Sequence, residues 1–371
     1  MAIVSGVRAP RAQVMIGGQS FNCLSARVNQ EATRKSSTMS ASCALNSFPG
    51  GDAFFAGLSD NKGSISIDGT PLCTGEWNSV NISYDHTLVE LTGQDDSTSL
   101  HQKKSSEKFS NQTQSDIVKK VAQRNNLNAQ VDQLPLLAGK LFQIDWAKLT
   151  DGISDAAIIH KIAELSGARW WVKNGTLYFK GKTDIASNYT VHYQAGEPSS
   201  GDFLRLGILL NLQASKSIEV NAESWHQKKK QTFTSQKKLL GFINPSLVYN
   251  YRTPGMEQDH LDDLTTNKAS ELARHEVEIH ALLVGDPSID IGMGLQLVGT
   301  AFAQTYEMDQ ICHWIGPEGY TMDITAKSAR EGRDSGTPPG GEAGGETTGG
   351  IGGGTTPGGT GGGATPGRTS P

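Results

Sequence analysis

The sequence predicts a mainly β protein in which a small α+β insert separates two β domains. Short segments of alternating apolar and polar residues occur before residue 100 and again after residue 200. Two helical stripes and one hairpin motif lie between them, and 22 of the 41 residues from 331 to 371 are Gly or Pro. The 371 residues exceed the usual size of one hydrophobic core. We therefore expect a first β domain at 1–105, an α+β insert at 106–196, a second β domain with a helical segment at 197–330, and a flexible tail at 331–371.

The first β domain is predicted from period-2 patterning. Val80, Ile82 and Tyr84 alternate with polar residues, as expected for a strand with one buried face. Gly17-Gly18 between two extended runs is typical of a hairpin. The expected strands cover 13–16, 21–28, 37–45, 63–68, 77–84 and 87–92. Many short strands of this kind favour a barrel or a sandwich.

The insert is predicted from two helices and a turn. Ser115 is a suitable N-cap for a helix whose apolar stripe runs from Ile117 to Ala122. A second helix is expected from Ser154 to Gly167, with Ile162 among its buried residues and the glycine ending it. Asn174-Gly175 between two strand-like runs predicts a type I′ hairpin, since both central residues need positive φ.

The second β domain repeats the strand character of the first. Its expected strands are 203–212, 215–225, 231–234, 276–284, 295–298, 304–314 and 319–326, with one helix at about 262–275. The Gly-rich tail that follows cannot offset its ordering entropy by burial, so residues 331–371 are expected to be disordered in the isolated protein.

Charge and composition narrow the class of protein. The net charge of -5, with no basic stripe interleaved with aromatic residues, disfavours sequence-specific nucleic-acid binding. No apolar run approaches the roughly 20 residues that span a membrane, and the first residues do not resemble a signal peptide. The lysines at 103–104 and 228–238 suit strand edges, with a surface facing DNA or an acidic partner as the alternative.

The cysteines give no sign of a disulfide framework or a zinc site. Cys23, Cys43, Cys73 and Cys312 are spread singly through the chain. We expect all four to be buried and reduced.

Three motifs superficially suggest chemistry. His275 and His280 flank two glutamates, but the i, i+5 spacing does not match the i, i+4 spacing of a zinc-binding helix. Gly292-Met-Gly294 lacks the third glycine and the helix of a dinucleotide site. Asp95 and Asp96 are adjacent, so their side chains diverge, and a turn or helix-capping role is expected. The sequence predicts no catalytic, cofactor-binding or metal site, and no cofactor.

Several segments, in order, resemble a known family. They are Val89-Glu-Leu-Thr-Gly-Gln-Asp95 followed by Phe109 and Thr113, then 282–297, then Tyr306 to Trp314 and Gly319 to Ile324. Together they resemble the baseplate hub proteins of contractile-tailed bacteriophages, of the late-control D type, and the hub portion of type VI secretion spike proteins. The resemblance covers about 10–328, and Gln94 stands where the family usually has a basic residue.

The resemblance implies two tail-tube-like β-barrels joined through the insert. It also implies that three copies form a ring of six barrels, which connects the hexameric tail tube to the trimeric spike. The expected protein is then a non-enzymatic structural component of the virion tail baseplate, assembled in the bacterial cytoplasm. Its partners would be two further copies, the tail tube protein, a separate spike protein, and tape-measure and baseplate wedge proteins. The spike is expected to be another polypeptide because this chain ends in low-complexity sequence.

Two other classes stay open at this stage. A tail-associated hydrolase acting on the bacterial envelope would use carboxylates such as Asp95 and Glu90. An adhesin or carbohydrate-binding β protein would bind sugar as a monomer. Under the hub hypothesis the acidic surplus lines a channel for DNA, and a lumen lined mainly by lysines would contradict that idea.

Overall fold

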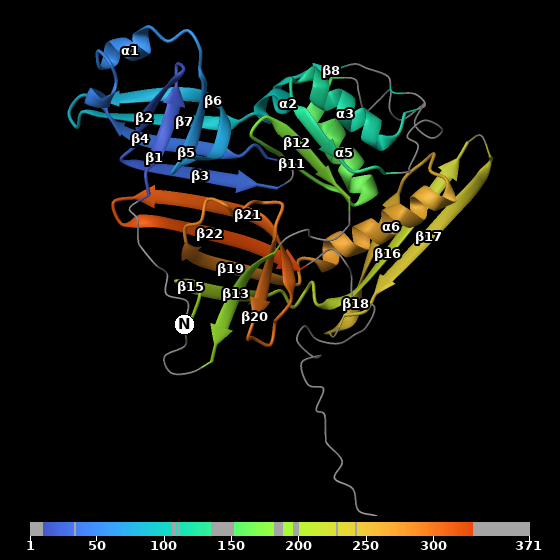
Figure 1. Ribbon diagram of the computed structural model, residues 1–371. Helices are drawn as coiled ribbons and strands as arrows, with labels where there is room; N and C mark the ends of the chain where they lie inside the picture. The colour runs from blue at the N-terminus through green and yellow to red at the C-terminus, as the bar shows by residue number, and fades with distance from the viewer. Residues whose placement is uncertain are drawn as a thin grey trace, which may run out of the picture.

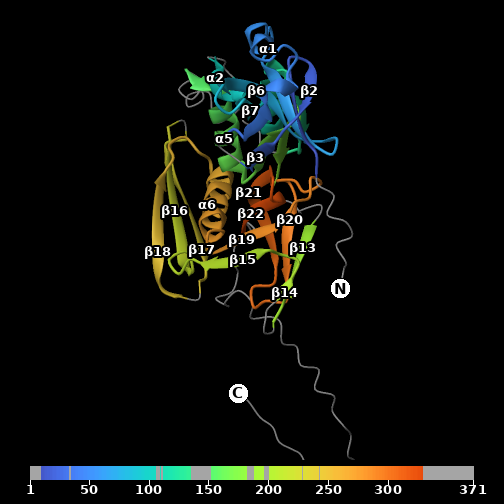
Figure 2. The ribbon, with the colours of Figure 1, turned by 90° about the vertical axis from the view of Figure 1, so that its left-hand side faces the viewer.

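The computed structural model describes residues 10–32, 35–105, 109, 112–134, 152–181, 188–195, 200–227, 229–241 and 243–328. The predicted Gly-rich tail at 331–371 lies outside these residues. Figures 1 and 2 show two stacked β units, with the helical insert beside the first and a separate sheet with one long helix beside the second. The fold is mainly β with an α+β insert, as the sequence predicts.

The first β unit, here the first barrel, contains seven strands. They are β1 (Ala12–Ile16), β2 (Gln19–Asn22), β3 (Ser25–Glu31), β4 (Thr38–Ala44), β5 (Lys62–Ile67), β6 (Thr70–Ser83) and β7 (Leu88–Asp95). Their spatial order is β3-β4-β7-β6-β5-β1-β2, and every neighbouring pair is antiparallel. The alternating residues place Val14, Ile65, Val89 and Leu91 in the core with almost no exposed surface. A short helix, α1 (Asp52–Ala56), brings Phe54 and Phe55 against Phe48, and was not predicted.

The insert packs its helices against a small sheet. Its elements are α2 (Thr98–Gln102), β8 (Lys104–Ser105), α3 (Gln114–Arg124), β9 (Asn128–Val131), β10 (Ile153–Ser154), α5 (Asp155–Ser166), β11 (Arg169–Lys173) and β12 (Thr176–Lys180). Strands β11, β12 and β9 form one sheet, and β8 pairs with β10. Ile117, Val121, Ile158, Ile159 and Ile162 are fully buried between α3, α5 and the sheet.

Local signals in the insert are largely confirmed. Ser154 caps α5 by accepting a hydrogen bond from the Ala157 amide, and Gly167 ends the helix with a φ of 68°. Asn174 and Gly175 have φ values of 47° and 68°, as the predicted type I′ turn requires. The predicted N-cap of α3, Ser115, is wrong by two residues. The N-cap is Thr113, which forms a reciprocal capping box with Asp116. Ser115 instead donates a hydrogen bond to the Asp132 carbonyl oxygen, so it ties α3 to the end of β9.

The second barrel is built from seven further strands. They are β13 (Asn188–Gln194), β14 (Ser200–Gly201), β15 (Arg205–Leu210), β19 (Val277–Val284), β20 (Gly294–Val298), β21 (Thr305–Gly316) and β22 (Gly319–Ser328). Residues 188–194, which fall in the predicted insert range, form β13, a strand that was not predicted and that pairs with β20, more than 100 residues away. Val277, Ile279, Ala281 and Leu283 are fully buried, which confirms the alternation predicted for 276–284.

Three strands of the 197–330 range lie outside the second barrel. Strands β16 (Lys216–His226), β17 (Gln231–Leu239) and β18 (Ile243–Arg252) form their own sheet, with β16 in the middle. Helix α6 (Gln258–Ala273) packs on β16 and β17 and touches α5. We expected β16 and β17 to complete the barrel and did not predict β18, because a period-2 pattern gives only the buried face of a strand and not the sheet that it joins.

The two barrels share one strand order. Written from the corresponding end, the second barrel reads β15-β19-β22-β21-β20-β13-β14, which matches the first barrel strand for strand along the chain. Both long central strands also carry a bulge at the corresponding point, between Trp77 and Ser79 in β6 and between Met308 and Gln310 in β21. One pair differs: β1 runs antiparallel to β5, whereas β13 runs parallel to β20.

Replacing Ile162 by Ala should lower the free energy of unfolding by ~2–5 kcal/mol, because the fully buried side chain would leave a cavity between α5 and its neighbours. Urea denaturation followed by circular dichroism measures the change. The matched control is Lys161→Ala on the same helix, whose half-exposed side chain should change stability by no more than about 0.5 kcal/mol. Equal stability of the two variants would refute the burial argument.

Candidate assembly interface

The two barrels are joined by direct strand pairing. The last part of β21 lies antiparallel to β3, with Gln310 opposite Glu31 and Ile315 opposite Ala26. The first part of β21 pairs with β20 of its own barrel, so one long strand serves both barrels. The junction makes a single 14-stranded sheet, and side chains reinforce it where Gln310 Nε2 donates to Asn29 Oδ1 at 2.7 Å.

The junction buries one face of both strands. Val28, Ile311 and His313 have at most 1% of their surface exposed. His313 Nδ1 lies 2.8 Å from the Tyr320 hydroxyl. Burial, with a smaller contribution from Lys173, lowers the pKa of His313 to about 4, so the ring is neutral at physiological pH.

An ionic cluster fixes the insert and α6 to the second barrel. Arg274, just after α6, has Nη2 2.6 Å from Asp309 Oδ1 and 3.3 Å from Glu307 Oε2. Arg169 of the insert approaches Glu307 Oε2 at 3.7 Å, and Lys327 of β22 lies 2.9 Å from Asp309 Oδ2. These charges come from three parts of the fold and meet where β21 carries its bulge.

The cluster holds Asp309 ionised despite its burial. Desolvation alone would raise the pKa of this carboxyl, but Arg274, Lys327 and Arg169 together outweigh it and lower the pKa to about 2. Arginines so deeply buried are tolerated because carboxylates compensate their charge.

The adjacent aspartates Asp95 and Asp96 accept hydrogen bonds from different parts of the fold. Asp95 is 4% exposed and accepts hydrogen bonds from the Ser97 amide and hydroxyl, at 3.2 and 2.5 Å. Burial raises the pKa of Asp95 to about 6, and hydrogen bonds from Ser97 and Ser37 oppose that rise. Asp96 Oδ2 accepts from the Thr74 hydroxyl at 2.5 Å and from the Gly175 amide at 2.9 Å, so it ties the insert hairpin to the first barrel.

The carboxylates named for a hydrolase are not brought together. Glu90 is exposed on β7 and accepts from Asn81 Nδ2 at 3.2 Å, whereas Asp95 points into the buried face of the same strand. The histidine motif starts at His275, before β19, and ends at His280 within that strand. His280 is exposed, and its Nε2 lies 3.0 Å from Glu278 Oε1. In the parts of the chain that the structure describes, no group of three or more side chains is placed to hold a metal ion.

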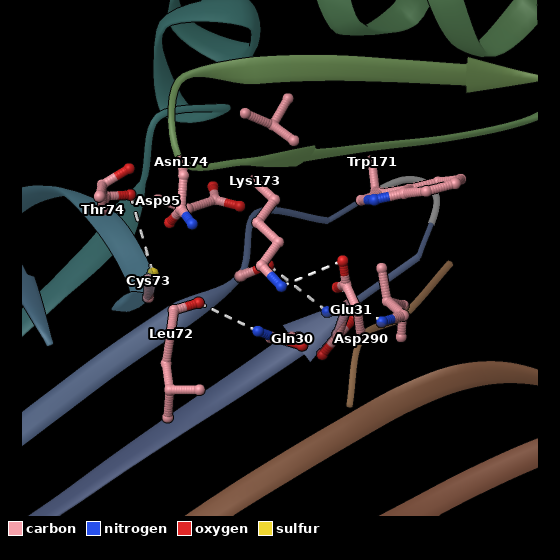
Figure 3. A pocket seen from close by; sticks show the side chains of 13 residues that line it. Gln30, Glu31, Leu72, Cys73, Thr74, Asp95, Trp171, Lys173, Asn174 and Asp290 are labelled. Atoms are coloured by element: carbon pink, nitrogen blue, oxygen red, sulfur yellow. Dashed lines mark hydrogen bonds and ion pairs between the residues drawn. The ribbon is translucent and has the colours of Figure 1, made fainter. Parts of the chain in front are cut away.

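A small cavity marks the seam between the first barrel, the insert and the loop after β19 (Figure 3). Gln30 Nε2 donates to the Leu72 carbonyl oxygen at 3.0 Å, and Lys173 Nζ lies 3.0 Å from Asp290 Oδ2. The volume of about 10 Å³ corresponds to about one water molecule. This seam therefore serves packing between units and does not offer room for a substrate.

The remaining predicted features are placed as follows. Cys43 and Cys73 are buried, whereas Cys23 and Cys312 are partly exposed, which corrects the expectation that all four are buried. All four are free thiols. Lys237 and Lys238 lie on β17, which pairs only with β16 among the described strands, so they occupy a sheet edge as predicted. Gly292-Met-Gly294 forms the turn into β20.

No helix in the described ranges is both long and apolar enough to cross a bilayer.

Replacing Asp309 by Asn should lower the free energy of unfolding at pH 7 by roughly 3–5 kcal/mol, since Arg274 and Lys327 would lose a buried counter-charge. The pKa of about 2 lies below the usual value near 3.9, so the contribution of Asp309 is complete above about pH 4 and is lost as the pH falls through 2. Urea denaturation from pH 7 to pH 2 should therefore show the two proteins converging. Asp323→Asn, at an exposed position on β22, is the control and should have little effect at any pH.

Comparison with known proteins identifies solved structures with a similar fold. No protein-family profile and no curated protein sequence matches the chain. Among solved structures, the tail protein from Neisseria meningitidis MC58 is similar over 86% of this chain and 97% of its own, with a TM-score of 0.64 and 14% identity. The 43 kDa tail protein of prophage MuSo2 from Shewanella oneidensis matches over 86% and 98%, with a TM-score of 0.66 and 10% identity.

A third similar structure comes from a secretion machine. The E. coli c3393 protein, a component of the type VI secretion system, matches over 88% of this chain and 80% of its own, with a TM-score of 0.54 and 10% identity. It is described as similar to the T4 bacteriophage tail proteins gp27 and gp5. The chain thus has a fold found in phage tail proteins and in a type VI secretion component.

Proposed function

We propose that this protein is a structural hub of a phage tail or a related injection machine. Three copies form a ring of six barrels, which joins the hexameric tail tube on one side to a trimeric spike on the other. The spike is a separate polypeptide, and tape-measure and baseplate wedge proteins are further partners. The protein acts in the tail baseplate of the virion after assembly in the bacterial cytoplasm.

The duplicated strand order carries this proposal. Each barrel has the same seven-strand order, and β3 and β21 join the two barrels through different edges. Such a contact is heterologous, because the surface used by one barrel differs from the surface used by the other. Heterologous contacts close into rings when the rotation between units divides a full turn. Two barrels per chain therefore allow three chains to present six similar units.

The anchoring contacts support a structural role. The insert is tied to the first barrel through Asp96 and to the second through Arg169 and Lys173. These buried and partly buried contacts hold the units in one arrangement, as a component that transmits symmetry requires. The tail-protein fold of the similar structures agrees with this role.

The purified protein should have a native mass three times that of its 39.6 kDa chain. Light scattering measures the mass, and electron micrographs of the particle should show a ring with six similar lobes and threefold symmetry. Addition of the tail tube protein of the same particle should place this ring at one end of the tube. A chain that stays monomeric at all concentrations and binds no tube would refute the hub.

A further inference from the structure

Each barrel has a strand edge without a partner among the described strands, in β6 of the first barrel and in β15 of the second. The last residues of β6, Ser79–Ser83, pair with β7 on one side and with no described strand on the other. Strand β15 pairs with β19, and its outer edge faces no described strand. Unpaired strand edges are ready to accept another strand.

The internal repeat relates these two edges to the junction that the chain already forms. The shared bulge aligns Trp77 with Met308, so Val80 corresponds to Ile311 and Ile82 to His313. The pairing of β4 with β7 and of β19 with β22 aligns Met39 with Ile279. It follows that Val28 of β3 corresponds to Ile208 of β15. The free end of β6 thus corresponds to the part of β21 that binds β3, and β15 corresponds to β3.

Residues on the two unpaired edges are more exposed than the corresponding residues at the junction of β3 and β21, as expected if a partner strand is missing from these edges. Ile311 and His313 are fully buried beside β3, whereas Val80 and Ile82 are partly exposed. Val28 is 1% exposed beside β21, whereas Ile208 is partly exposed. Leu209 on the other face of β15 is 55% exposed.

We propose that β6 of one copy pairs antiparallel with β15 of the next copy, with Ile82 opposite Ile208 and Asn81 opposite Leu209. This register transfers the observed pairs His313 with Val28 and Cys312 with Asn29 to the corresponding strands. The inference rests on the proposed ring of copies and specifies the surface that closes it. The sheet of each chain would then continue into the next without interruption.

The side chains fit this register. Val80 and Ile82 would face Leu210 and Ile208, so apolar residues meet on the face that is buried at the existing junction. A shift by one residue would place Asn81 and Ser79 against these apolar residues, and a half-buried sheet disfavours such a slip. Leu209, the exposed leucine of β15, would lie opposite Asn81 of a second copy of this chain.

A disulfide across the proposed contact tests it. The double variant Asn81→Cys with Leu209→Cys places two exposed positions directly opposite each other, at a spacing that a disulfide can bridge. Mild oxidation should convert most of the protein to a covalent trimer on a non-reducing gel, and a reductant should reverse it. The matched control, Asn81→Cys with Arg205→Cys, moves one cysteine four residues along β15, about 13 Å away. It should give no covalent trimer, and the single variants report any bond to the four native thiols.

The outcomes separate this inference from the hub itself. A native mass of three chains without cross-linking of the in-register pair, or with equal cross-linking of the control, overturns the β6 to β15 pairing and leaves the hub standing. A native mass of one chain overturns both. Hydrogen exchange of the unaltered protein is an independent measurement: amides of 78–83 and 205–210 should exchange more slowly in the trimer than in dilute monomer, and unchanged exchange contradicts the pairing.

Discussion

The pairing of β3 with β21 is the contact on which the rest of the structure depends. Without it the barrels would be linked through the insert and the connecting chain, and interfaces between domains of one chain commonly permit relative motion. The backbone hydrogen bonds of six residue pairs fix both the distance and the angle between the barrels. The insert packs against both joined barrels and contacts Asp96 on one and Asp290 on the other.

The buried charges favour this packing of the insert and α6 over other arrangements. Arg169, Arg274 and Lys327 approach Glu307 and Asp309 from three parts of the fold. If the insert or α6 docked elsewhere, some of these ions would be buried without partners, which costs several kcal/mol. The apolar clusters supply the bulk of the stabilisation, and the ionic cluster disfavours other ways of packing the same surfaces.

Local features of the fold could be predicted from the sequence, whereas long-range pairings could not. The Asn174-Gly175 turn and the ends of α5 depend on residues a few positions apart, so the pattern of residues reports them directly. The pairing of β13 with β20 and the separate sheet of β16–β18 depend on partners far away in the chain. The same limit applies to the candidate interface: nothing in the spacing of Arg169, Arg274 and Asp309 indicates that they meet. The resemblance of ordered segments to hub proteins supplied the two-barrel expectation, and the matching strand order agrees with it.

The direction of β13 limits how alike the two barrels can be. Relative to β1 in the first barrel, β13 runs the opposite way, so the chain enters the two barrels from different ends. In the proposed ring of three copies, the walls formed by strands would therefore repeat six times, whereas the turns and connections at the rims would come in two alternating kinds. A partner that touches only the walls would meet six similar positions, and a partner seated on the rims would meet three.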